Sequence, residues 1–76
     1  MHAEHTARFE AVGADRLIHS VDEWTIMVPH RGAPQGAPAG REWFLDGEPV
    51  ELVDERRGEY RVMATGVRLR RLPITD

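Results

Sequence analysis

Closely spaced turn signals divide the C-terminal half of the chain into short stretches. Gly47, Gly58 and Gly66 each separate two stretches in which apolar and polar residues alternate. Alternation with a period of two is typical of strands that bury one face. Asp46 and Gly47 form an Asp-Gly pair between two such stretches, and such a pair is a strong hairpin signal. Residues 42–72 therefore predict four short antiparallel strands joined by tight turns.

The N-terminal part is less regular. Residues 24–28 alternate as a strand and residues 16–21 also favour one, so the acidic pair at 22–23 predicts either a turn or a bulge within one long strand. Residues 3–12 allow a short helix or a strand that ends in a hairpin loop at residues 13–15. We favour the strand, because an isolated helix of about ten residues is marginal in water.

A segment rich in proline and glycine lies in the middle of the chain. Residues 29–40 hold three prolines and three glycines. Proline removes a backbone donor and glycine has no side chain to pack, which argues against a helix or a central strand. We therefore expect a mobile or extended loop there, inside a single small β domain that spans residues 1–76.

These elements together predict the fold class. A short chain rich in strands exposes their edges to other chains unless the sheet closes on itself. We predict a mainly all-β fold, a small antiparallel barrel or rolled sheet of about five to seven short strands, with one short N-terminal helix as the alternative for residues 3–12. The residues expected in the core are Phe9, Val12, Leu17, Ile18, Trp24, Ile26, Val28, Trp43, Leu45, Val50, Leu52, Tyr60, Val62, Val67 and Leu69.

Composition narrows the setting. All ten basic residues are arginine, and asparagine is also absent, which indicates a bacterial genome rich in G and C or a phage that lives in one. Without cysteine, disulfides and thiolate metal sites are excluded. The N-terminus has neither a basic region nor an apolar stretch, and no run approaches the roughly 20 apolar residues of a membrane helix, so we expect a cytoplasmic protein.

No group of residues predicts catalysis. Ser20 is the only serine and stands in a strand, and the histidines lack the spacing of a metal motif. We therefore expect no enzyme, no cofactor and no metal. His30 and Arg31 open the proline-rich and glycine-rich segment, where they are candidates for contact with a protein partner.

Charge is distributed unevenly along the chain. Residues 56–72 contain six arginines and one glutamate, whereas acidic residues predominate before them. Strand alternation places Arg61, Arg68 and Arg70 on one face. These guanidinium groups could bind phosphates, or they could pair with acids such as Glu51 on the neighbouring strand.

The favoured function is a small non-catalytic protein-interaction module that binds its partner through a sheet edge or through the loop. A phage or prophage accessory or inhibitor protein fits this description. Phe44 alternates against its apolar neighbours and should point outward, so we predict a homodimer with Phe44 and Met63 at the contact. The alternative is a small nucleic-acid-binding barrel that uses the arginine-rich C-terminal hairpin.

Overall fold

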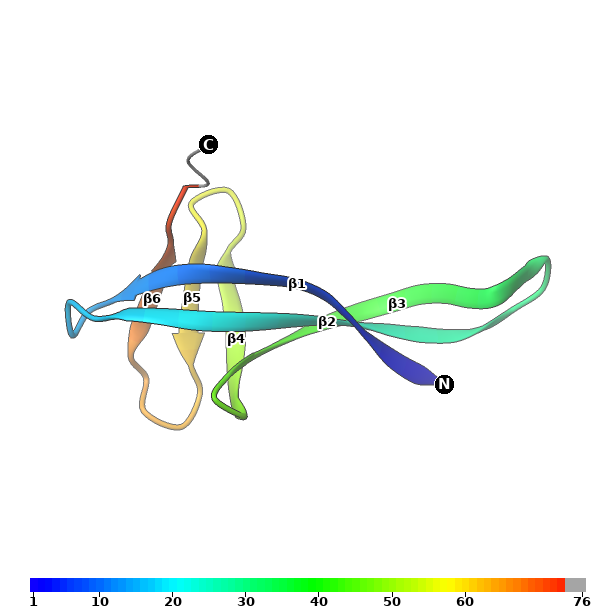
Figure 1. The fold of residues 1–76 in the computed structure, drawn as a ribbon, viewed down its shortest axis with the longest axis horizontal. Coiled ribbons are helices and arrows are strands. Elements are labelled where there is room, and N and C mark those ends of the chain that lie inside the picture. The colour runs from blue at the N-terminus through cyan, green and yellow to red at the C-terminus, as the bar shows by residue number, and fades with distance from the viewer. Residues whose placement is uncertain (74–76) are drawn as a thin grey trace.

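A computed structural model of the chain describes residues 1–73 and shows a closed antiparallel barrel in which each strand pairs with the next and β6 pairs back with β1 (Figure 1). The strands are β1 (His2–Gly13), β2 (Ile18–His30), β3 (Ala33–Leu45), β4 (Glu48–Asp54), β5 (Glu59–Val62) and β6 (Arg68–Arg71). No helix occurs among residues 1–73. The all-β prediction is confirmed, and residues 3–12 form a strand.

The short connections follow the predicted turn chemistry. Asp46 and Gly47, with φ of 49° and 82°, are the two residues between β3 and β4. Positive φ at both central positions is the geometry of a tight hairpin turn that matches the twist of its strands. Between β1 and β2, the Asp15 carboxylate accepts the backbone N–H of Leu17 at 3.0 Å. Both hairpins were expected from the sequence.

β2 is one uninterrupted strand of 13 residues, and the acidic pair at 22–23 lies inside it. The irregularity is on its partner. Register shifts between His5 and Ala7 of β1, so Thr6 is an extra residue in that strand. An extra residue in one strand of an antiparallel pair is a bulge, which increases the local twist. Of the two alternatives for residues 22–23, the long strand is confirmed.

The prediction of a loop at residues 29–40 is wrong. β2 continues to His30 and β3 begins at Ala33, so only a two-residue turn separates them. The physical reason is that this part of β3 pairs with β2 alone. Proline is tolerated on such an edge strand because one side of its backbone needs no partner. Two register shifts between β2 and β3 accommodate the irregular backbone.

The longest strands extend beyond the barrel. β3 pairs with β4 only from Trp43 to Leu45, and β1 pairs with β6 only from Ala11 to Gly13. The remaining lengths form a projection, which we call the arm: residues 24–42 of β2, β3 and their turn, with residues 2–6 of β1 alongside. Figure 1 shows it leaving one side of the barrel. The molecule measures 45 × 32 × 21 Å as a result.

The core is small and lies inside the barrel. Its buried members are Phe9, Ala11, Val21, Trp43, Val50, Tyr60, Val62 and Leu69, with Leu45, Leu52 and Val67 packed against them. Nine of these were predicted, whereas Ala11 and Val21 were not.

Other predicted core residues lie elsewhere. Leu17 and Ile18 are 61% and 63% exposed beside the first hairpin turn, so their prediction is wrong. Val12 is half-buried on the outer face of β1, because Ala11 and Gly13 occupy the inward positions. Trp24, Ile26 and Val28 are half-buried, but they lie on the arm and outside the core cluster. Their alternation predicted a strand correctly. The prediction that their side of this strand faces the barrel interior is wrong.

A row of aromatic rings crosses the barrel. The Tyr60 ring on β5 lies 5.1 Å from that of Phe9 on β1 and 5.6 Å from that of Trp43 on β3. Each end of the row is covered by a guanidinium: Arg71 is 4.3 Å from the Phe9 centroid, and Arg41 is 5.2 Å from the Trp43 centroid. Each aromatic pair adds about 0.5–1.5 kcal/mol beyond its burial, so the row ties together strands that are not neighbours.

Replacing Gly36 by alanine should loosen the arm. Gly36 has a φ of +88°, and a Cβ there would lie 2.8 Å from the carbonyl oxygen of Val28. Strain and collision together predict a cost of at least about 1 kcal/mol. In Gly36→Ala we expect amide hydrogen exchange at Met27 and Val28, followed by NMR, to be at least about five times faster than in the wild type.

Gly40→Ala is the matched control, because its φ is not positive and a Cβ there would meet nothing within 4 Å. It should leave exchange unchanged or slow it slightly, since alanine restricts the unfolded chain. Equal protection of the arm in the two variants would contradict the assigned geometry at Gly36.

Candidate interaction surfaces

The outer face of the arm contains two large apolar side chains, Trp24 and Ile26. Ile26 pairs with Ala3 on one side and Gly40 on the other. Trp24 pairs with His5, whose ring packs edge-on against the indole at 5.1 Å. Directly paired residues share one face of a sheet, so small partners leave Ile26 with little lateral cover. This pattern leaves an apolar surface, which we call the Trp24 face, outside the core.

A charged group borders the Trp24 face. Asp22 Oδ1 accepts hydrogen bonds from Arg8 Nε at 2.8 Å and from the His5 ring at 2.9 Å. The Arg8 hydrogen bond, followed by that from His5, lowers the pKa of the Asp22 carboxyl below its ordinary value. The carboxylate therefore stays ionised in neutral solution and orients the His5 ring that covers Trp24.

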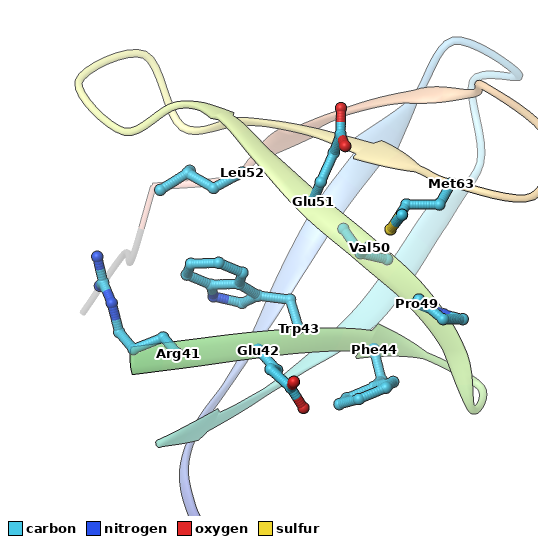
Figure 2. Close-up of a pocket in the computed structure, with 9 residues that line it drawn as sticks. All are labelled: Arg41, Glu42, Trp43, Phe44, Pro49, Val50, Glu51, Leu52 and Met63. Carbon is cyan, nitrogen blue, oxygen red and sulfur yellow. The ribbon is translucent and has the colours of Figure 1, made fainter. Parts of the chain in front are cut away.

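A groove opens where β3 and β4 diverge. Past the short ladder of Trp43 to Leu45, neither β3 nor β4 has a backbone partner on its facing side. The groove has a volume of 410 Å³, and its walls include Phe44 and Met63. Figure 2 shows Trp43 and Phe44 on opposite sides of β3, with the indole towards Leu52. We call this hollow the β3–β4 groove.

Arg41 bridges the open end of this groove. Its Nη2 donates to Glu55 Oε1 at 3.0 Å, and its Nη1 lies 3.4 Å from Glu23 Oε1. Thr6 donates to the other Glu23 oxygen at 3.1 Å. The hydrogen bond to Glu55 raises the pKa of the Arg41 guanidinium. Side-chain contacts therefore join β3 to the end of β4 where no backbone ladder does.

The Tyr60 hydroxyl titrates in an unusual environment. Burial raises its pKa above the ordinary value, and the neighbouring Arg71 guanidinium opposes that shift in part. The folded protein therefore holds the phenolic proton more tightly than the unfolded chain does. Stability that depends on this proton is complete below the unfolded pKa of about 10 and is lost as pH rises through the higher native value.

The predicted contact residues fall into two groups. Phe44, which is half-buried, and Met63, which is 60% exposed, line the same groove. His30 and Arg31 lie instead at the tip of the arm, where both are exposed. The structure thus brings Phe44 and Met63 to one place and puts His30 and Arg31 in another.

Two of the three arginines predicted for phosphate contact form ion pairs with acidic neighbours. Arg61 pairs across the strands with Glu51, and Arg68 Nη1 lies 3.8 Å from Glu59 Oε2. Arg70 lies opposite Glu59 in the β5–β6 register but forms no ion pair within residues 1–73. Cross-strand pairing with acids therefore describes Arg61 and Arg68, and Arg70 differs from them.

Trp24 and Ile26 were missed as surface candidates because their alternation assigned them to the core. Glu23 and Thr25 alternate with Trp24 and Ile26, and they share the parity of Val21, which is buried in the barrel. A strand whose inward face is partly polar cannot be oriented by hydrophobicity alone. Glu23 on this inward face has a polar partner in Arg41, which is distant from it in the sequence.

Comparison with known proteins returns no matching family model, no similar curated protein and no similar solved structure. No helix in residues 1–73 has the length and apolar character to cross a membrane. In the same part of the chain, no three histidine or acidic side chains are grouped so that they could hold a metal ion.

The alkaline stability of the barrel should depend on Tyr60. The chain has one tyrosine, no lysine and no cysteine, so Tyr60 is the only side chain besides arginine that titrates well above neutral pH. The native phenolate should appear, by ultraviolet absorbance, at a pH above the ordinary midpoint of about 10. The urea midpoint should fall over the same range.

Tyr60→Phe is the matched variant, because it keeps the ring and removes the titrating group. Its urea midpoint should change less between pH 9 and pH 11 than that of the wild type, a window around the unfolded pKa of about 10. A native titration at the ordinary midpoint would show that the hydroxyl is not held as described.

Proposed function

We propose that this protein is a small non-catalytic protein-interaction module, and that the Trp24 face of the arm docks on another protein. The observation that supports the proposal is the arm itself. The radius of gyration is 13.9 Å, whereas a compact domain of this length has about 11 Å. A chain with so small a core thus places a large part of its length where it stabilises the barrel little.

The chemistry of the arm favours a protein partner. Tryptophan is enriched at the residues that dominate binding energy in protein interfaces, and Trp24 is half-buried beside the apolar Ile26. His5, Arg8 and Asp22 border these residues with polar groups, as the rim of an interface does.

Proline directs docking to the face and away from the free edge of β3. That edge contains Pro34 and Pro38, which have no N–H to donate to an added strand. Prolines on edge strands protect against pairing with other chains. The sequence prediction named a sheet edge or the loop as the binding element; the proposal now assigns binding to the face of the arm that this segment forms.

The alternative of a nucleic-acid-binding barrel has less support. Arg61 and Arg68 have acidic neighbours, and the net charge of the chain is −3. The wider setting inferred from composition, a phage or prophage accessory or inhibitor protein in a GC-rich bacterial system, remains part of the proposal.

Removing the apolar side chains of the arm should abolish partner binding. The variant is Trp24→Ser/Ile26→Ser. A tagged wild-type protein should retain a specific protein from bacterial extract, quantified by mass spectrometry, and the variant should retain at least about tenfold less, since interface tryptophans carry large shares of binding energy. Its thermal melting should stay close to that of the wild type, because both residues lie outside the core.

Leu17→Ser/Ile18→Ser is the control, since it removes two exposed apolar side chains from the far hairpin. It should retain the same protein as the wild type. Equal retention by all three forms, or loss of retention in the control, would refute docking through the Trp24 face.

The predicted homodimer is tested separately at the β3–β4 groove. Sedimentation equilibrium at tens of micromolar should show a dimer for the wild type and a monomer for Phe44→Ser/Met63→Ser, because both side chains line that groove. Val53→Ser is the control, because it removes an exposed apolar side chain of β4, and it should remain dimeric. A monomeric wild type, or a Phe44→Ser single variant that unfolds, would contradict the dimer contact.

A further inference from the structure

A second groove, remote in sequence from the arm, is lined by four arginines. It lies between the β4–β5 turn and β6 and has a volume of 710 Å³. Arg56 and Arg57 come from the turn, and Arg70 and Arg71 come from the end of β6. We call it the arginine groove. None of its lining residues belongs to the arm or to the β3–β4 groove.

The backbone holds the two arginine pairs close together. The N–H of Arg71 donates to the carbonyl of Gly58 at 2.8 Å, so the turn rests directly on β6. A Cβ on Gly58 would lie 3.1 Å from the Cβ of Arg71, closer than most side-chain contacts. The Asp54 carboxylate accepts the N–H groups of Arg56 and Arg57 at 3.0 and 3.3 Å. These backbone contacts therefore fix the position of the β4–β5 turn on β6.

The nearby acids already have partners. Glu59, which lies opposite Arg70 in the strand register, is 3.8 Å from Arg68 Nη1. Glu55, which also lines the groove, is bound by Arg41 at 3.0 Å. Asp54 is occupied by the turn and lies 3.8 Å from Arg57 Nε. Within residues 1–73, Arg56, Arg70 and Arg71 form no ion pair. Three of the four arginines in the groove therefore lack an ion-pair partner of their own in the described part of the chain, and a bound anion can supply one.

The remaining walls indicate which anion fits. Val12, Leu72 and Pro73 give the groove an apolar surface, and no aromatic ring is among its described lining residues. Nucleic-acid single strands are usually held by bases stacked on aromatic rings, for which this groove offers no platform. Aliphatic side chains of a peptide suit the apolar wall, and its carboxylates suit guanidinium groups in two-pronged geometry.

We propose that the arginine groove binds an extended acidic segment of a protein, in which carboxylates alternate with aliphatic residues. The Arg71 guanidinium is fixed over the Phe9 ring and beside the Tyr60 hydroxyl, so it adds positive charge next to the groove from a fixed position. The exposed guanidinium groups of Arg56, Arg57 and Arg70 supply the contacts with carboxylates. This site is independent of the Trp24 face.

The experiment is fluorescence anisotropy with a labelled peptide of alternating glutamate and leucine, at low salt, using the full chain. The wild type should bind the peptide, and binding should weaken as salt rises. Arg56→Gln/Arg57→Gln should bind about tenfold more weakly, and Arg70→Gln a few-fold more weakly. Arg71 is left intact because it also packs on the core.

Arg16→Gln is the matched control, since it removes one exposed arginine that does not line the groove. It should bind within about twofold of the wild type, as expected for a distant screened charge. Circular dichroism melts should show that all variants fold.

Three results would overturn the proposal. The wild type does not bind the peptide at low salt, or Arg16→Gln weakens binding as much as Arg70→Gln does, which would mean that only net charge matters. The third is that a single-stranded oligonucleotide of equal charge binds more tightly than the peptide at the same salt, which would assign the groove to nucleic acid.

Discussion

The barrel depends on the aromatic row that joins β1, β5 and β3 through its interior. Apart from Phe9, Tyr60 and Trp43, the buried core consists of small and medium aliphatic residues such as Ala11, Val21 and Leu69. Few of these can reach across a barrel, whereas three rings in contact do so. The guanidinium groups at both ends shield the row from water while keeping their own charges solvated. One set of contacts thus spans the barrel interior and covers both ends of the aromatic row.

Closure at the β3–β4 junction is the weakest part of this arrangement. The backbone ladder there covers only the three residues from Trp43, and Arg41 supplies a side-chain link to Glu55 beyond it. Because β3 is released from β4 so early, it can continue with β2 into the arm. The same divergence creates the β3–β4 groove. The arm and the groove are therefore two results of one short ladder.

The C-terminal half could be predicted from the sequence because its turns have strong local signals. Asp46 and the glycines that follow each strand mark the boundaries, and the alternation between them identifies the inward residues correctly. Residues 29–40 could not be assigned in this way. Their composition describes what the backbone tolerates, whereas strand pairing there depends on β2, which supplies a neighbour on one side only.

Some of the candidate sites could likewise be predicted from the sequence, and others could not. Phe44 was predicted to point outward by simple alternation, and it lies on the opposite side of β3 from Trp43 (Figure 2). Trp24 could not be placed, because the inward face of its strand contains Glu23, whose partner Arg41 is on another strand. The arginine groove could not be predicted from the sequence either. Alternation along β5 and β6 selects Arg61, Arg68 and Arg70, of which only Arg70 lines the groove, because the groove is formed by a turn that rests on β6.

The two tryptophans occupy different parts of this fold, and each has its own optical environment. Trp43 is buried in the aromatic row, and its indole nitrogen has no hydrogen-bond partner within residues 1–73. Trp24 lies half-exposed on the arm beside the His5 ring. Emission from Trp43 thus reports on the integrity of the barrel, while emission from Trp24 reports on whatever covers or quenches the arm. The chain carries two intrinsic fluorophores that can be read separately, without an added label.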